Sequence, residues 1–241
     1  MKFALISDIH GNIEALDAVV KDAKARGLDN FLCLGDVVGY GPNPAECVDL
    51  VQSLHCPVIR GNHDQFAATD MKLDGCNEDA RASLEWTREQ LTSDQRKWLA
   101  QLPLTSMLGN FVIAHANLID PGYFGYVRDE EDADLCLNEQ SVPICFIGHT
   151  HVPAIFIHGE GVTPTEVTNS YAIQPGTKTL VNVGSVGQPR DGDPRAAYVV
   201  YDAEKQIFTF QRVAYNIEKT QEKLRSIGLP EDLAARLGDA A

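Results

Sequence analysis

The chain has 241 residues, of which 44% are hydrophobic, so it is long enough to bury one sizeable core. It carries 34 acidic residues against 20 lysines and arginines, which gives a formal net charge of -14. This acidic balance argues against non-specific binding to DNA or RNA and against attraction to anionic membrane surfaces.

No apolar run approaches the roughly 20 residues of a membrane span, and the apolar stretch 3–6 is too short for a secretory signal. The cysteines form no CxxC pair and are sparse for a chain of this length. We therefore expect free thiols, no membrane association and residence in a reducing cytoplasm.

The first expected elements alternate between strands and helices. Residues 2–6 predict a buried strand, and Asn12 is placed to cap a helix that ends at Gly27. The next expected elements are a strand at 31–34, a helix at 44–54 and a strand at 57–59. This order predicts parallel strands whose site lies beyond their carboxyl ends.

Further helices are expected at 79–91, 93–102 and 130–139, and buried strands at 111–114 and 144–147. The loop 118–128 between them contains aromatic residues and glycine, so we interpret it as a lid over the site. Its aromatic side chains, Tyr123, Phe124 and Tyr126, can stack on a base, although an ordinary packed loop is the preferred interpretation.

The last third of the chain changes character. Its alternating segments predict antiparallel strands at 154–158, 171–173, 179–183, 197–201 and 207–212. Two terminal helices follow at 217–227 and 230–237. We expect one domain spanning residues 1–241, with the terminal region 216–238 packed on it.

Side chains that can bind a metal follow each apolar run. Asp8 and His10 lie on one face if the strand continues, and so do His149 and His151, because residues i and i+2 point the same way. Asp36 ends a neighbouring strand and can bridge two ions. Imidazole combined with carboxylate suits zinc, iron or manganese better than calcium. The competing interpretation of the stretch 60–64 is a simple turn.

Taken together, the motifs closely resemble those of the calcineurin-like metallophosphoesterase family, in particular its small bacterial phosphodiesterase-type members. The matching segments are Asp8-x-His10, Gly35-Asp36, Gly61-Asn62-His63-Asp64, His115, Gly148-His149-Thr150-His151 and the run 182–190. The resemblance implies an α/β fold built as a four-layer α/β/β/α sandwich.

The resemblance also implies two divalent ions, manganese first, with iron, nickel or zinc as alternatives. One ion would be held by Asp8, His10, Asp36 and His151, and the other by Asp36, Asn62, His115 and His149. His63 would act on the phosphoryl oxygens as a catalytic residue, and Asp64 would orient it. Substrate contacts are expected from Asn12, Tyr40, Asn117 and Arg190.

The implied activity is that of a dinuclear phosphoesterase in which a metal-bridging hydroxide attacks phosphorus in line. Protein phosphatases and diadenosine tetraphosphatases of the family carry an arginine where this chain has Tyr40, which favours phosphodiesters or small phosphorylated molecules as substrates. The alternatives are a protein or nucleotide phosphomonoesterase and a non-catalytic scaffold of the same fold.

Overall fold

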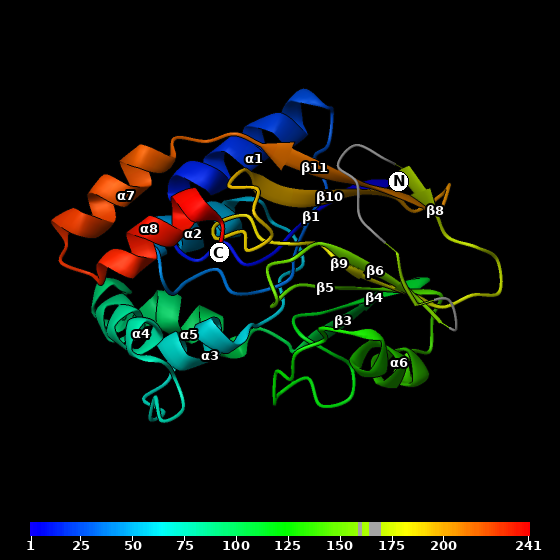
Figure 1. The fold of residues 1–241 in the computed structure, drawn as a ribbon, viewed down its shortest axis with the longest axis horizontal. Helices are drawn as coiled ribbons and strands as arrows, with labels where there is room; N and C mark the ends of the chain where they lie inside the picture. Colours follow the sequence, from blue (N-terminus) through cyan, green and yellow to red (C-terminus); the bar gives the residue numbers. More distant parts are fainter. Residues whose placement is uncertain (159–160, 164–169) are drawn as a thin grey trace.

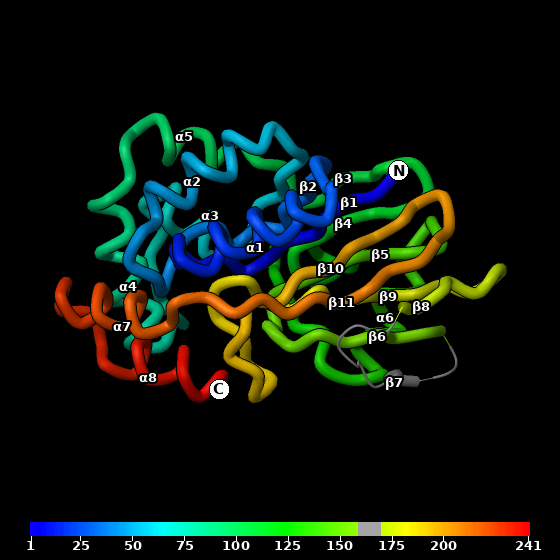
Figure 2. The backbone as a smooth tube through the Cα atoms, turned by 90° about the horizontal axis from the view of Figure 1, so that it is seen from above, coloured from blue at the N-terminus to red at the C-terminus, as the bar shows by residue number. Residues whose placement is uncertain are grey.

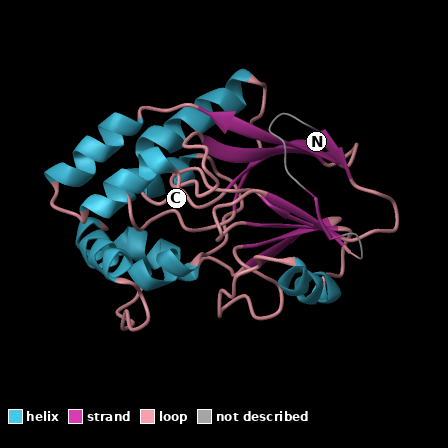
Figure 3. Ribbon diagram, in the orientation of Figure 1, coloured by secondary structure: helices cyan, strands magenta, loops and turns pink. Residues whose placement is uncertain are grey.

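The computed structural model describes residues 1–158, 161–163 and 170–241. Two β-sheets face each other, with helices on their outer sides (Figures 1 and 3). In spatial order, the first sheet contains β2 (Phe31–Cys33), β1 (Lys2–Ile6), β10 (Ala196–Asp202), β11 (Ile207–Val213) and β8 (Ser170–Ala172). The second contains β3 (Thr105–Leu108), β4 (Phe111–Ala114), β5 (Ile144–Ile147), β9 (Thr179–Asn182), β6 (Ala154–Ile157) and β7 (Gly161–Thr163).

The helices are distributed unevenly around the sheets. They are α1 (Ile13–Ala25), α2 (Pro44–Ser53), α3 (Asn62–Ala68), α4 (Glu78–Gln90), α5 (Ser93–Gln101), α6 (Glu130–Glu139), α7 (Ile217–Ser226) and α8 (Glu231–Asp239). Helix α6 covers the outer face of the second sheet, while the others gather over the first sheet and at one end of the molecule (Figures 1 and 2).

Three apolar layers hold these elements together. Leu5, Phe146 and Tyr201 lie in the layer between the two sheets. Ile6, the neighbour of Leu5 in β1, points the other way and packs with Leu16 beneath α1, as the twofold alternation of a strand requires. A third layer lies between the second sheet and α6. The expected four-layer α/β/β/α arrangement is therefore confirmed.

The start and end of α1 follow from local chemistry. The Asn12 side chain accepts a hydrogen bond from the Ala15 backbone amide at 3.1 Å and so caps the first turn. At the other end, Gly27 adopts φ +74°, and the Leu28 amide donates to the Ala23 carbonyl at 3.0 Å. Both predicted boundaries of this helix are confirmed.

The third expected strand, at 57–59, is wrong. Only one isolated parallel bridge forms there, between Cys33 and Val58. Pro57 has no amide proton to donate, and the Arg60 amide turns away to the Pro103 carbonyl at 2.8 Å. The chain then enters α3, a helix that was not expected, because the stretch 60–64 was predicted to be a strand end carrying site residues.

Strand directions also differ in part from the prediction. The strand β9 runs antiparallel to β6 but parallel to β5, and β3 pairs antiparallel with β4 without having been expected. The expected strand at 171–173 is one residue earlier, as β8. The segment 161–163 forms β7, which was not expected either.

The terminal helices α7 and α8 pack against residues of the loop after β2 and of α4. Leu224, Leu233 and Leu237 form an apolar cluster with Tyr40 and Ala80. Polar contacts add to it, because the carboxylate of Glu14 lies 2.7 Å from Nζ of Lys223 and 3.0 Å from that of Lys219. Within the described ranges, no helix is long and apolar enough to cross a membrane.

Candidate metal centre

The loops that follow four strands bring the predicted ligands together at one edge of the two sheets. Asp8 and His10 follow β1, Asp36 follows β2, His115 follows β4, and His149 and His151 follow β5. Asn62 arrives from the first turn of α3. Every aspartate and histidine of this set is at most 7% exposed, so the ligand atoms lie in a low-dielectric environment.

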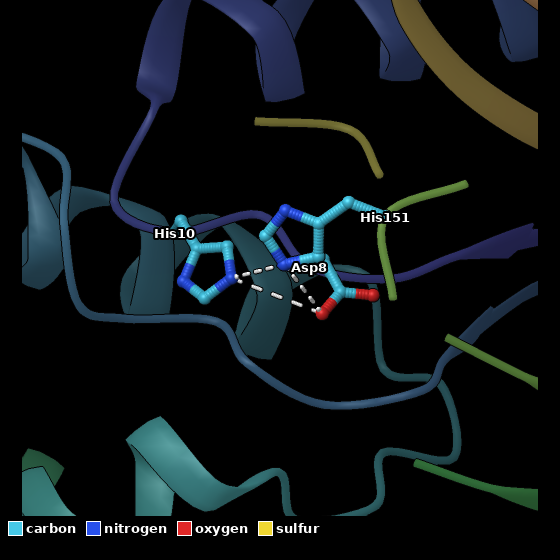
Figure 4. Close-up of side chains that lie close together, drawn as sticks. All are labelled: Asp8, His10 and His151. Carbon is cyan, nitrogen blue, oxygen red and sulfur yellow. Dashed lines mark hydrogen bonds and ion pairs between the residues drawn. The ribbon is translucent and has the colours of Figure 1, made fainter. Parts of the chain in front are cut away.

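Three of these side chains form a first group. The Nε2 atoms of His10 and His151 lie 3.0 Å apart, and Oδ1 of Asp8 lies 3.8 and 3.3 Å from them, respectively (Figure 4). All three ligand atoms converge within 4.8 Å of one another. Two imidazole nitrogens and one carboxylate oxygen at this spacing can hold one divalent ion.

A second group is formed by Asp36, His115 and His149. Oδ2 of Asp36 lies 3.3 Å from Nε2 of His115 and 3.7 Å from Nε2 of His10, which belongs to the first group. Oδ1 of Asn62 lies 3.2 Å from the same nitrogen of His115. Asp36 thus stands between the two groups, within reach of both.

Backbone carbonyls orient three of the imidazoles. His10, His115 and His151 each donate a hydrogen bond from Nδ1 to a carbonyl oxygen, at 3.1, 2.8 and 2.6 Å. The acceptors are Val38, Leu34 and Gln188, respectively. In the neutral ring, such a bond fixes the tautomer and leaves Nε2 with its lone pair facing inward, the arrangement typical of metal-binding histidines.

Electrostatics place the carboxylates in their charged form. Burial opposes ionisation, but His151 and His115 hold the pKa of Asp8 well below its usual range. Burial acts in the same way on Asp36, and His115 and His63 likewise keep the pKa of that carboxyl low. Ionised carboxylates are the form that binds a cation.

Most of the imidazoles, by contrast, are neutral. Burial lowers the pKa of His149 to about 3 and that of His10 well below its usual range. His115 is the exception: burial would lower its pKa, but Asp36 and Asp8 raise it to about 10. The proton on His115 offsets the negative charges of Asp36 and Asp8. A cation held beside these carboxylates would offset them instead, and His115 would then be neutral.

Two atoms of the cluster lack a hydrogen-bond partner among the described residues. They are Oδ1 of Asp8 and Nε2 of His149, and both are buried. Buried polar atoms without partners are rare in folded proteins, and a cation would supply what each of these lacks. The unpartnered atoms, the ionised carboxylates and the inward-facing Nε2 atoms all fit a divalent metal site.

Backbone strain is concentrated at the same residues. Five of the ten described non-glycine residues with positive φ are Asp8, His10, Asp36, His149 and His151, at 48–69°. The extended geometry expected for the last two is therefore wrong. Their side chains diverge, and each joins a different group. Left-handed backbone costs energy and persists where the surrounding structure enforces it, typically at functional sites.

His63 lies beside the first group, although it was expected only to contact substrate. Its ring centroid is 4.9 Å from that of His10, and its ligand atom converges with those of His10 and Asp36. Burial lowers its pKa to about 4. Its Nδ1 has no hydrogen-bond partner in the described part of the chain.

Among the described residues, the carboxylate of Asp64, expected to orient His63, forms hydrogen bonds to backbone amides and none to the His63 ring. Its Oδ1 accepts hydrogen bonds from the amides of Val37 and Val38, at 2.9 and 3.3 Å, and its Oδ2 from Gly61 at 3.1 Å. Burial and the nearby Asp36 raise the pKa of Asp64 to about 7. The carboxylate instead joins the start of α3 to the loop after Asp36.

Two expected substrate contacts are occupied by structural bonds. Asn12 donates to the Gly187 carbonyl at 2.9 Å, and its oxygen caps α1. Asn117 accepts from the amides of Ile119 and Asp120 and donates to the Gly125 carbonyl at 2.7 Å. Asn117 thereby shapes the loop 118–128, because a short amide side chain can substitute for a turn.

The other two expected contacts, Tyr40 and Arg190, lie beside the site. The Tyr40 ring centroid is 4.5 Å from that of His63, and the Arg190 guanidinium carbon lies 5.8 Å from the Tyr40 centroid. A cavity of about 730 Å³ opens next to them. Its lining includes Asn62, His63, the aromatic loop residues and the carboxylates of Asp74 and Asp132.

The loop 118–128 lies directly over one group. The Tyr126 ring stacks on His149, with centroids 4.1 Å apart and planes at 25°. Tyr123 is 80% exposed, so it is not the packed residue that the preferred interpretation of this loop expected. Whether the loop acts as a lid stays a prediction.

Sequence reasoning missed the supporting role of the segment 182–190. Asn182 donates to the Gly148 carbonyl at 2.6 Å and to the Thr150 hydroxyl at 2.9 Å. Ser185 donates to the Asp8 carbonyl at 2.8 Å. The signal was a run of small and turn-forming residues directly after a buried strand, which brings backbone close to the ligand loops.

Comparisons with known proteins agree with this geometry. The family model of the calcineurin-like phosphoesterase superfamily domain matches residues 1–206. An uncharacterized protein of Methanocaldococcus jannaschii is 38% identical over 238 residues, covering 97% of this chain and 96% of the relative. A metallophosphoesterase from Sphaerobacter thermophilus superposes with a TM-score of 0.91 at 37% identity, covering 100% and 99% of the two chains. A hypothetical protein from Pyrococcus horikoshii shares the fold, with a TM-score of 0.82, 20% identity and the same coverage.

The fold and the clustered ligands thus define a metallophosphoesterase. The chain belongs to the calcineurin-like phosphoesterase family, which consists of hydrolases of phosphate esters that bind divalent metals. The Asp and His groups described above are the residues that can hold metal in this member.

Proposed function

We propose that this protein is a dinuclear metal-dependent phosphoesterase that hydrolyses phosphodiesters or small phosphorylated molecules. The observation that carries the proposal is the position of Asp36 between two ligand groups, with its Oδ2 atom 3.3 and 3.7 Å from an imidazole nitrogen of each. A carboxylate in that position can serve two cations at once.

The proposed ligands divide between two ions. Asp8, His10, Asp36 and His151 hold one, and Asp36, Asn62, His115 and His149 hold the other. The bound ions, with manganese as the first choice and iron, nickel or zinc as alternatives, would supply an acidified water and neutralise charge on the phosphoryl oxygens.

The chain's own contribution is a positioned proton donor. His63 lines the large cavity beside both ligand groups, and no carboxylate of the described residues forms an ion pair with its ring. We assign to it a hydrogen bond to the phosphoryl group, and proton transfer to the leaving oxygen once the negative charge of the bound phosphoryl group raises the imidazole pKa from the value of about 4 that burial gives it. Asp64 supports it indirectly, by holding the first turn of α3 through the Gly61 amide.

Tyr40 favours phosphodiesters over phosphomonoesters. Its ring lies 4.8 Å from that of His10 and 4.5 Å from that of His63, and the phenol carries no charge at neutral pH. It therefore cannot pair with the second negative charge of a monoester, as the arginine at this position in other branches of the family would. The cavity beyond it is wide enough, at about 730 Å³, for a second ester substituent.

The direct test is hydrolysis of bis-p-nitrophenyl phosphate and p-nitrophenyl phosphate by protein loaded with manganese. We expect both to be cleaved and the diester to be preferred. A higher relative rate on the monoester would reverse the substrate preference, and loss of both activities would favour the scaffold alternative. Hydrolysis of an ester with chiral phosphorus should invert its configuration, because a single displacement has no covalent intermediate.

A further inference from the structure

A second cavity, of about 340 Å³, adjoins the large one, and Tyr126 and Arg128 line both. Thr150, between the proposed ligands His149 and His151, lines it, and so does Tyr126, which stacks on His149. The rest of its wall is apolar, with Val127, Val152, Ala154 and Phe156, except for two arginines, Arg128 and Arg190.

The charge of this cavity is opposite to that of the chain. The protein has a formal net charge of -14, yet no acidic residue lines the smaller cavity, whereas Asp74 and Asp132 line the larger one. Neither Arg128 nor Arg190 forms an ion pair with a carboxylate in the described ranges. Most other arginines of this acidic protein do pair, for example Arg225 with a carboxylate at 2.7 Å.

Both guanidinium groups are held in place by neutral partners. The Arg128 guanidinium carbon lies 4.0 Å from the centroid of the Tyr126 ring, whose stacking partner is His149. Arg190 donates from Nη2 to the Gln188 side-chain oxygen at 2.8 Å. Guanidinium groups held in this way keep free N–H donors, and such donors bind carboxylates or phosphates in a bidentate manner.

We propose that this cavity is a subsite for a second anionic group of the substrate, held between Arg128 and Arg190 while the scissile phosphate lies at the ligand groups. This inference rests on the proposed function, since it places the reacting phosphate at the metal centre. The preferred substrate is thus a phosphate ester with an additional phosphate or carboxylate. Its uncharged portion faces the larger cavity, which Arg128 also lines but where the carboxylates of Asp74 and Asp132 oppose an anion.

The test compares inhibitors that differ in their second anionic group. Methylphosphonate has none, phosphonoacetate adds a carboxylate, and methylenediphosphonate adds a phosphonate. We expect the wild-type protein to bind the two-anion ligands roughly 10- to 100-fold more tightly than methylphosphonate. Arg128→Gln should reduce this preference by about tenfold, and Arg128→Lys should retain part of it because the charge remains.

Inhibition of p-nitrophenyl ester hydrolysis and titration calorimetry supply two independent readouts of the preference. Lys24→Gln, an exposed charge removal on α1, is the matched control and should keep the wild-type preference. The inhibitors chelate metal in solution to the same extent for every variant. A difference in ligand preference between variants therefore comes from binding to the protein. Of phosphonoacetate and methylenediphosphonate, the ligand that gains more affinity over methylphosphonate identifies carboxylate or phosphate as the second group.

The experiment distinguishes a failure of the subsite inference from a failure of the proposed function. If the wild-type protein hydrolyses the model esters but its ligand preference is equal in Arg128→Gln, Arg190→Gln and Lys24→Gln, the subsite is refuted and the proposed function stands. If the metal-loaded wild-type protein hydrolyses neither ester, the proposed function and the subsite inference are both overturned.

Discussion

Asp64→Asn provides a sharp test of how the first turn of α3 is held. The carboxylate accepts three backbone hydrogen bonds, two at Oδ1 from Val37 and Val38 and one at Oδ2 from Gly61, and it is fully buried. An asparagine retains one oxygen, so at least one of these amides must face an NH₂ group that cannot accept.

At a pH well above the pKa of about 7 of Asp64, the carboxylate is charged. A hydrogen bond to a charged group contributes about 1.5–3 kcal/mol, and a buried donor without a partner adds its own cost. We therefore expect Asp64→Asn to lower the free energy of unfolding by about 2–4 kcal/mol. The measurement is urea denaturation monitored by circular dichroism, with metal content and hydrolysis rate determined on the same preparation.

Asp17→Asn is the control, since it removes a half-exposed surface carboxylate that pairs with Lys21 one turn away on α1. Its effect should stay within about 0.5 kcal/mol. The reasoning is refuted if Asp64→Asn unfolds at the same urea concentration as the wild-type protein. A loss of rate with unchanged stability would instead restore a direct role in orienting His63.

Two further substitutions test other parts of the structure. A Cβ on Gly148 would lie 2.3 Å from Oδ2 of Asp8, so Gly148→Ala should reduce metal content and activity. In the control Gly122→Ala, the nearest atom to the new Cβ is 3.5 Å away, and metal content should not change. Equal metal content in the two variants would contradict the packing argument. Burial alone would raise the pKa of Glu14, but its hydrogen bonds to Lys223 and Lys219 lower it. The stabilisation is therefore present above the ordinary pKa of about 4.5 and is lost as the pH falls through the lowered value. Thermal unfolding of Glu14→Gln should show a smaller loss of melting temperature between pH 6 and pH 3 than the wild-type protein, and parallel curves would refute this.

The convergence of the aspartates and histidines of the candidate metal centre could be predicted because it depends on residue type and on where strands end. Aspartate and histidine follow β1, β2, β4 and β5 directly, and the carboxyl ends of neighbouring strands meet at one edge. The grouping of His149 with His115, and of His151 with His10, depends on left-handed backbone that residue spacing does not reveal. For that pairing, the resemblance was a better guide than strand periodicity.

The incorrect predictions have two sources. Some depend on local sequence signals that fit more than one structure, and others depend on contacts between residues far apart in the sequence. The Gly61 amide donates to the carboxylate of Asp64 three residues later at the start of α3, a local signal that the turn-forming dipeptides obscured. The turn made by Asn117 was also local. In contrast, the contacts of Asn12 with Gly187 and Thr220 join residues more than 170 positions apart, and no local pattern predicts them.

The central claim is that two metal ions share Asp36, and elemental analysis of three purified proteins saturated with manganese tests it most directly. The wild-type protein and His63→Ala should each retain two ions per chain, while Asp36→Asn should lose them. Asparagine is chosen because its oxygen can keep the 2.8 Å hydrogen bond that Asp36 accepts from the His63 amide. A wild-type content of one ion per chain would contradict the account. So would an equal loss of metal in His63→Ala, which would make His63 a ligand, as its convergence with His10 and Asp36 permits.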